Sequence, residues 1–133
     1  MNEQPAYVLD HVGLAVRDIA ASRRFYEAAL EPLGFSVVVE FGDPPTLGIG
    51  LPRMPQVWLH EGEPAAPVHV AFHAHDRASV DAFHAAALAA GGRDNGAPGV
   101  RPHYHPSYYA AYALDPDGNN VEAVCHAPAN EPS

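Results

Sequence analysis

The sequence predicts an α+β fold in which two tandem βαβββ modules form an open eight-stranded cleft. Two observations predict it: an internal repeat, and strand-like and helix-like segments that alternate in the same order within each copy. At an offset of 58 residues, segment 11–35 aligns with segment 69–93, and nine of the 25 aligned pairs are identical. We therefore interpret residues 1–133 as a single domain, with module 1 at about 7–61, a linker at 62–67 and module 2 at about 68–126.

Each copy opens with a strand-like segment that is followed by a helix-like one. Segments 9–16 and 68–74 alternate in polarity, which is typical of a strand. Asp18 and Asp76 follow at the N-cap position, where a carboxylate accepts hydrogen bonds from unpaired amides. Apolar residues then recur at helical spacing. They are Ile19, Tyr26, Ala29, Leu30 and Leu33 in the first copy, and Val80, Phe83, Ala87 and Leu88 in the second.

The remaining strands follow each helix and are separated by turn-forming residues. Module 1 shows strand-like segments at 35–41, 46–51 and 55–60. In module 2 we expect a loop-rich stretch and then strands at 108–114 and 121–125, joined by a tight turn rich in Pro, Gly and Asn at 115–120. The polar, proline-containing segment 61–67 is typical of a linker.

Composition excludes several classes of function. A formal net charge of −9 disfavours binding to nucleic acid, because it repels a phosphate backbone. No segment approaches the roughly 20 apolar residues that a membrane-spanning helix needs, and the N-terminus does not resemble a signal peptide. The single cysteine, Cys125, cannot form an internal disulfide. We expect a cytoplasmic protein that binds a small molecule, with neither nucleic acid nor membrane as a partner.

Three residues are candidate metal ligands. His11 and His69 occupy equivalent positions in the two copies, on the strand face opposite the apolar residues. If the modules pair about a pseudo-twofold axis, the two imidazoles face each other across the cleft. Glu122 is the expected third ligand, because a carboxylate among apolar neighbours is costly to bury unless it is paired or binds a metal ion. Two histidines and a carboxylate are typical of ferrous iron, with Mn, Zn, Ni and Co as alternatives.

Simpler interpretations of the same residues stay open. His11 and His69 can be strand histidines bonded to the backbone, and Glu122 can be an edge-strand carboxylate in water. His73 is a spare ligand candidate, because it shares a strand face with His69. For His84, within the second predicted helix, we expect solvent or a surface hydrogen bond.

The order of these motifs resembles a known superfamily. Segment 9–16 with Asp18, then His69 and the residues after it, then segment 115–122 are similar to the vicinal oxygen chelate superfamily of glyoxalases, bleomycin-resistance proteins and ring-cleaving dioxygenases. The resemblance covers nearly the whole chain and implies that His11, His69 and Glu122 bind the metal ion. Trp58 stands where glyoxalase I enzymes have a fourth ligand, and an indole cannot ligate a metal ion. This departs from the glyoxalase I pattern.

Residues of module 2 are candidate catalytic groups. Segment 102–112 is similar to the stretch that places a histidine and a tyrosine beside the substrate in ring-cleaving dioxygenases. His103 or His105 can move a proton at neutral pH, and Tyr108 or Tyr112 can bind an oxyanion. The same residues can instead be a polar loop and an aromatic-packed strand. We predict His103, Tyr108 and Tyr112 as the catalytic set.

We therefore expect an enzyme that depends on a divalent metal ion and chelates vicinal oxygens of a small substrate. Ring cleavage and lyase or isomerase chemistry are both open, and the latter needs a base, for which His60, Glu61 and His103 are the candidates. The alternative is a drug-sequestering protein of the bleomycin-resistance type, with which the acidic charge agrees. The resemblance implies a homodimer. The cleft can close within one chain or by exchange of modules between two.

Overall fold

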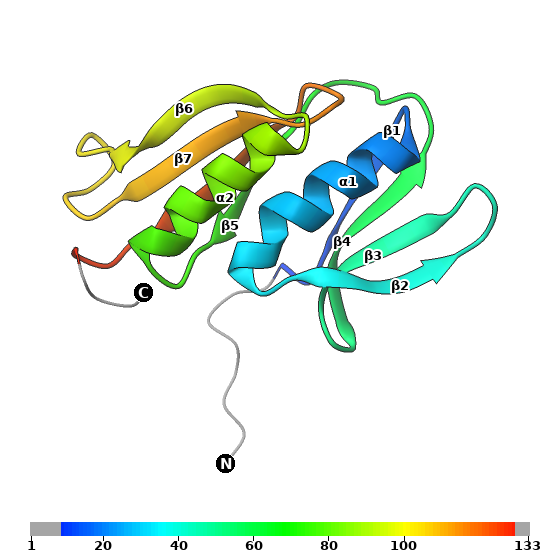
Figure 1. Ribbon diagram of the computed structural model, residues 1–133, viewed down its shortest axis with the longest axis horizontal. Helices are drawn as coiled ribbons and strands as arrows, with labels where there is room; N and C mark the ends of the chain where they lie inside the picture. Colours follow the sequence, from blue (N-terminus) through cyan, green and yellow to red (C-terminus); the bar gives the residue numbers. More distant parts are fainter. Residues whose placement is uncertain (1–8, 130–133) are drawn as a thin grey trace, which may run out of the picture.

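The computed structural model describes residues 9–129, which form two four-stranded sheets and two α-helices (Figure 1). No helix in this range is long and apolar enough to cross a membrane. The elements are β1 (Val12–Val16), α1 (Ile19–Leu30), the 3-10 helix η1 (Glu31–Leu33), β2 (Ser36–Phe41), β3 (Thr46–Leu51), β4 (Met54–Glu61), β5 (His69–His73), α2 (Arg77–Ala89), β6 (Arg93–Val100), β7 (Tyr109–Leu114) and β8 (Asn120–Cys125).

The two sheets have the same topology. The strand order is β1-β4-β3-β2 in the first sheet and β5-β8-β7-β6 in the second. β1 runs parallel to β4, and β5 runs parallel to β8, whereas the other neighbours are antiparallel. This confirms the predicted α+β class with two βαβββ modules. Each module keeps its own sheet, and β1 and β5 are edge strands.

Both helices begin at the predicted aspartates. The Asp18 side chain accepts a hydrogen bond from the amide of Ala21 at 3.1 Å. Asp76 accepts one from the amide of Ser79 at 2.8 Å and another from its hydroxyl at 2.7 Å. These bonds hold the pKa of Asp76 below its usual value, the hydroxyl of Ser79 having the larger effect. The carboxylates thus satisfy helix amides that have no partner within the helix.

α1 and α2 lie side by side and bury one core that belongs to both modules (Figure 1). Phe25 and Tyr26 of α1 are almost inaccessible to solvent, as is Phe83 of α2. Gly92 lies against this contact. A Cβ at this glycine would lie only 2.5 Å from Cε1 of Phe25, so the close approach of α1 to the end of α2 requires glycine there.

One expected loop is a strand. We expected a loop-rich stretch after the second helix, but residues 93–100 form β6 and pair with β7. The pairing shifts register near Gly96 and again before Gly99. Glycine and proline in this segment hide the alternating pattern of a strand. His84 of α2, for which we expected solvent or a surface bond, is mostly buried, and its Nε2 lies 3.0 Å from Oδ1 of Asp94 on β6.

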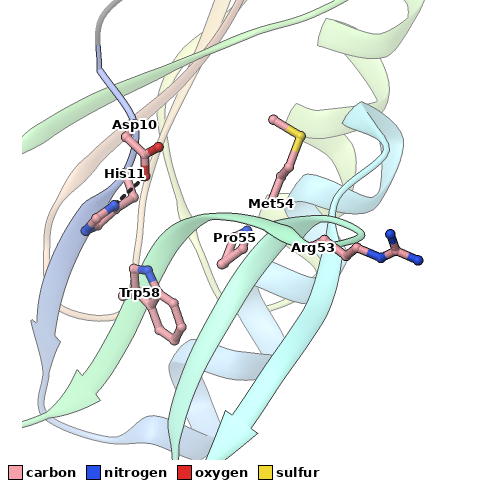
Figure 2. A pocket seen from close by; sticks show the side chains of 6 residues that line it. All are labelled: Asp10, His11, Arg53, Met54, Pro55 and Trp58. Atoms are coloured by element: carbon pink, nitrogen blue, oxygen red, sulfur yellow. Dashed lines mark hydrogen bonds and ion pairs between the residues drawn. The ribbon is translucent and has the colours of Figure 1, made fainter.

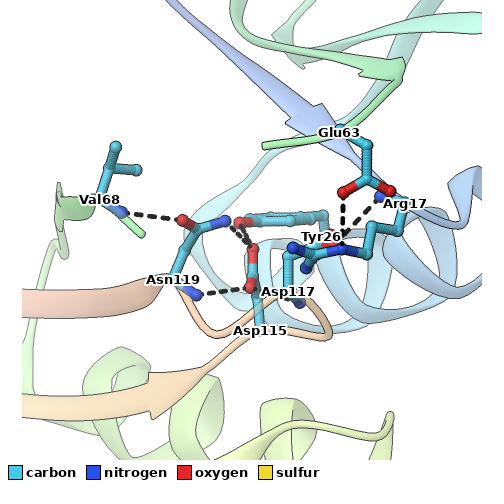
Figure 3. Close-up of polar contacts among 7 residues, drawn as sticks. All are labelled: Arg17, Tyr26, Glu63, Val68, Asp115, Asp117 and Asn119. Carbon is cyan, nitrogen blue, oxygen red and sulfur yellow. Dashed lines mark hydrogen bonds and ion pairs between the residues drawn. The ribbon is translucent and has the colours of Figure 1, made fainter. Parts of the chain in front are cut away.

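A buried carboxylate in the turn before β8 links the two modules (Figure 3). Asp115 is 2% exposed and accepts a hydrogen bond from the Tyr26 hydroxyl of module 1 at 2.5 Å. Asn119 donates to Asp115 from its side chain and its amide, both at 2.8 Å, and accepts from the amide of Val68 at 2.9 Å. Burial, and then the Asp115 carboxylate, raise the pKa of Tyr26 well above 10, so its hydroxyl remains a donor.

Replacing Tyr26 with phenylalanine is expected to lower the free energy of unfolding by about 1.5–3 kcal/mol, because it removes a hydrogen bond to a buried carboxylate. Urea denaturation measures the change. Tyr104→Phe is the control, because Tyr104 is 60% exposed, and it should leave the midpoint nearly unchanged. Equal midpoints for the Tyr26→Phe variant and the wild type would show that the bond does not stabilise the pairing of the modules.

Candidate functional site

The centre of the candidate site is the buried carboxylate of Glu122 on β8. Its side chain is 1% exposed, although it lies on the sheet face opposite the core. Strand pairing places Ala71 of β5 on one side of it and Tyr112 of β7 on the other. Glu122 is therefore a fully desolvated carboxylate. Such a group is costly to bury unless it is paired or binds a metal ion, as the sequence predicted.

Two side chains hold this carboxylate. Nε2 of His69 lies 2.7 Å from Oε1 of Glu122, and the Tyr108 hydroxyl donates a hydrogen bond to Oε2. The His69 side chain is half exposed, so the pair lies at the edge of solvent-accessible space. The alternative in which Glu122 is an edge-strand carboxylate in water is wrong, because β8 lies between β5 and β7 and the side chain is buried.

Tyr108 and Tyr112 form the wall beside Glu122. Burial, and then the bond to Glu122, raise the pKa of Tyr108 well above 10. Burial, and then the charge of Glu122, also raise the pKa of Tyr112. The ring of Tyr112 lies 6.3 Å from that of His69. Both hydroxyls therefore stay protonated at neutral pH. The Tyr108 hydroxyl donates its proton to Glu122, and the Tyr112 hydroxyl can donate to an oxygen placed beside Glu122.

His11 lies in the other module, just before β1 (Figure 2). Its Nδ1 is 2.6 Å from Oδ1 of Asp10, and its side chain is about half exposed. Asp10, His11 and Trp58 line an open pocket of about 300 Å³ together with the β3–β4 hairpin. Trp58 therefore forms part of the pocket wall beside His11.

The structure does not bring His11 to the other two predicted ligands. Within residues 9–129, no three His, Cys, Asp or Glu side chains lie close enough together to hold a metal ion. One chain instead presents two separate parts, His11 with Trp58 on the first sheet and His69 with Glu122 on the second. The expected meeting of His11, His69 and Glu122 is therefore not observed within a single chain.

The loop between β6 and β7 places its two histidines differently. His103, a predicted catalytic residue, packs against the exposed Tyr104, with 4.2 Å between ring centroids and the two rings tilted by 42°. His105 lies further inside, with its ring 5.4 Å from that of Tyr108, and Nε2 bonds to Nδ1 of His126 at 2.8 Å. Sequence reasoning missed His126. The strand alternation of β8 could have revealed it, because this alternation puts Glu122 and His126 on the same face.

Comparisons with known proteins agree with this fold. A model of the Glyoxalase/Bleomycin resistance protein/Dioxygenase superfamily matches residues 8–123. A glyoxalase/bleomycin resistance protein from Albidiferax ferrireducens T118 is 30% identical with a TM-score of 0.71, over 89% of this chain and 98% of that one. A mutant glyoxalase I from Zea mays is 25% identical with a TM-score of 0.67, over 87% of this chain and 45% of that one. No curated protein matches the sequence.

Glu122→Gln is expected to lower the pKa of Tyr108 without returning it to 10, because burial is the larger cause of its elevation. Carbon-13 NMR of the tyrosine ring, followed against pH, measures this. A raised pKa in the folded chain means that Tyr108 stabilises the fold below pH 10, and that this contribution is lost as pH rises through the higher value.

The matched control is the Tyr109 hydroxyl, which donates to Asp81 at 2.6 Å. Burial, and then this bond, raise the pKa of Tyr109 to about 12. Asp81→Asn should lower the pKa of Tyr109 and leave that of Tyr108 unchanged. Glu122→Gln should lower the pKa of Tyr108 and leave that of Tyr109 unchanged. Ionisation of Tyr108 near pH 10 in the wild type would contradict the site described above.

Proposed function

The chain belongs to the Glyoxalase/Bleomycin resistance protein/Dioxygenase superfamily, and from that premise we propose that it is a metal-dependent enzyme that chelates two neighbouring oxygens of a small substrate. The observation that carries the proposal is the buried Glu122, whose carboxylate contacts His69 and Tyr108. A desolvated carboxylate beside an imidazole nitrogen on an accessible face is a typical donor pair for a divalent cation.

The donor chemistry fits such an ion. Glu122 supplies carboxylate oxygens, and the Nε2 atom of His69 that faces them can ligate when it carries no proton. A bound divalent ion would act as a Lewis acid toward the two substrate oxygens. One nitrogen and one carboxylate suit iron, manganese, zinc, nickel or cobalt, and do not select among them.

The third ligand in this proposal is His11 of a second copy of the chain. His11 lies beside the edge strand β1, and His69 lies on the edge strand β5. In a twofold dimer, each chain can present module 1 to module 2 of its partner, which gives two equivalent sites. This is the module exchange that the sequence left open, and the proposed homodimer follows from it.

The remaining side chains would position the substrate. Tyr112, held protonated, would donate a hydrogen bond to an oxyanion beside Glu122, and Tyr108, which donates its proton to Glu122, would hold that carboxylate in place. Trp58 of module 1 lines the pocket that His11 borders, so it contributes an apolar wall in place of a ligand. His103 is the proposed proton carrier, and in this conformation its ring packs at a tilt against the ring of Tyr104.

Metal analysis of untagged protein tests the ligand set. The wild type should retain a divalent ion, and His69→Ala and Glu122→Gln should each lower the affinity about 100-fold or more, since each removes a donor. His75→Ala, an exposed histidine outside the site, should retain it. Wild-type protein without metal would contradict the enzyme proposal and favour a drug-sequestering protein. Oxygen consumption on catechols would separate ring cleavage from lyase or isomerase chemistry.

Mixing two defective variants tests the sharing of the site. His11→Ala and His69→Ala chains, unfolded and refolded together, form heterodimers in which one site has both histidines and the other has neither. About a quarter of the wild-type metal content should return, because half the dimers are mixed and each has one complete site. A mixture of His69→Ala with Glu122→Gln should return none. No recovery in the first mixture would mean that each site lies within one chain.

A further inference from the structure

The sheet face that carries Glu122 continues across β7 to β6. Strand pairing sets Glu122 of β8 opposite Tyr112 of β7, and sets Tyr112 opposite Gly96 of β6. A Cβ at Gly96 would lie 2.7 Å from Cδ1 of Tyr112, so the tyrosine ring covers this glycine. Because neighbouring strands are about 4.8 Å apart, the backbone of Gly96 lies roughly 10 Å from that of Glu122. The candidate site therefore has a second end, two strands away from the carboxylate.

Arg101 supplies a positive charge at this second end. Its guanidinium carbon lies 5.2 Å from the centre of the Tyr112 ring, within the range of a cation–π contact. A Cβ at Gly96 would lie 3.2 Å from Nη2 of Arg101, and a Cβ at Gly99 would lie 3.1 Å from Nη1. The guanidinium thus lies against both glycines of β6, on the same face as the tyrosine ring. Larger residues at these two positions would crowd it.

Two backbone carbonyls fix the guanidinium. Nη1 donates a hydrogen bond to the carbonyl of Gly99, and Nη2 donates one to the carbonyl of Ala97, both at 2.8 Å. The main chain is fixed as well, because the amide of Arg101 donates to the carbonyl of Tyr108 at 2.7 Å. A guanidinium has five N–H groups, so three of them remain for another acceptor. The side chain is therefore held in place with donors to spare.

The charge of Arg101 is not balanced by a neighbouring carboxylate. Within residues 9–129, the partners of its guanidinium are two carbonyls and one ring. Arg17 and Arg23, by contrast, each pair with two carboxylates. Arg101 is also partly buried, and a cation removed from water is stabilised by a negative partner. The chain as a whole carries a net charge of −9 and repels anions, so an anion that binds here must be recognised locally.

We propose that Arg101 binds a negatively charged group of the substrate, a carboxylate or a phosphate, with the ring of Tyr112 between this group and the chelating oxygens. A guanidinium can form two parallel hydrogen bonds to either anion. The assignment rests on the proposed function for its role in substrate binding, but affinity for an anion can be measured without a metal ion. The substrate class is a small acid that is long enough to reach across two strands, roughly 10 Å.

Two-dimensional ¹H–¹⁵N NMR of the arginine Nε–H groups of the full chain, near neutral pH and without added metal, tests the assignment with inorganic phosphate and acetate as probes. Phosphate should shift the Arg101 signal saturably. This signal is observed in the wild type, so the test does not depend on the folding of a variant. Acetate that displaces phosphate extends the assignment to carboxylates, whereas acetate that does not restricts it to phosphate.

Two substitutions of Arg101 measure the contribution of its charge and of its shape. The backbone amides of β6 and β7 report phosphate binding in every variant. Arg101→Gln should weaken binding about tenfold or more, because it removes a charged hydrogen-bond donor. Arg101→Lys keeps the charge without the planar fork, so its affinity should lie between those of the wild type and the glutamine variant.

Two controls separate this proposal from a general charge effect and from the metal site. Arg93→Gln removes an exposed arginine at the other end of β6 and should leave phosphate affinity unchanged. His69→Ala, which should lose the metal ion, should still bind phosphate, so failure of the metal site does not remove the anion effect. Wild-type spectra without a saturable shift of Arg101 would overturn the assignment. Equal phosphate affinity in the wild type and the Arg101→Gln variant would also overturn it.

Discussion

The contact between Tyr26 and Asp115 sets the geometry on which the site depends, because it joins the two modules inside a shared core. Asp115 lies in the turn that leads into β8, so the bond ties α1 of module 1 to the strand that carries Glu122. The same carboxylate organises its own turn through Asn119, which accepts from the start of module 2 at Val68. A buried charge with several donors tolerates little displacement, so the modules are held in one relative position.

The division of the candidate site follows from this arrangement. Packing of α1 against α2 buries the apolar faces of both sheets in one core, and His69 and Glu122 lie on the opposite face of their sheet. His69 and Glu122 meet because β5 and β8 are neighbours in one sheet, whereas His11 belongs to the other. A second copy that supplies module 1 is the proposed solution.

The sequence predicted features that depend on local chemistry. Asp18 and Asp76 cap the helices, because a carboxylate just before a helix accepts hydrogen bonds from amides that have no partner within it. The duplication implied two modules with the same topology. Strand β6 was missed because its glycines interrupt the alternation. The His105–His126 bond was also missed, because it depends on the path of a loop and no periodicity encodes that path. The repeat predicts two equivalent modules but does not predict how they pair. A few buried contacts between the modules decide that pairing.

The most direct test of the shared site is a crystal structure of the protein grown with a divalent transition metal, with diffraction data collected at the absorption edge of that metal. The account predicts an anomalous peak at about 2.0–2.2 Å from His69 and Glu122 of one chain and from His11 of its twofold partner. A peak bound by His11, His69 and Glu122 of the same chain would contradict the exchange of modules. A peak elsewhere, with the His69–Glu122 hydrogen bond intact, would contradict the metal site itself.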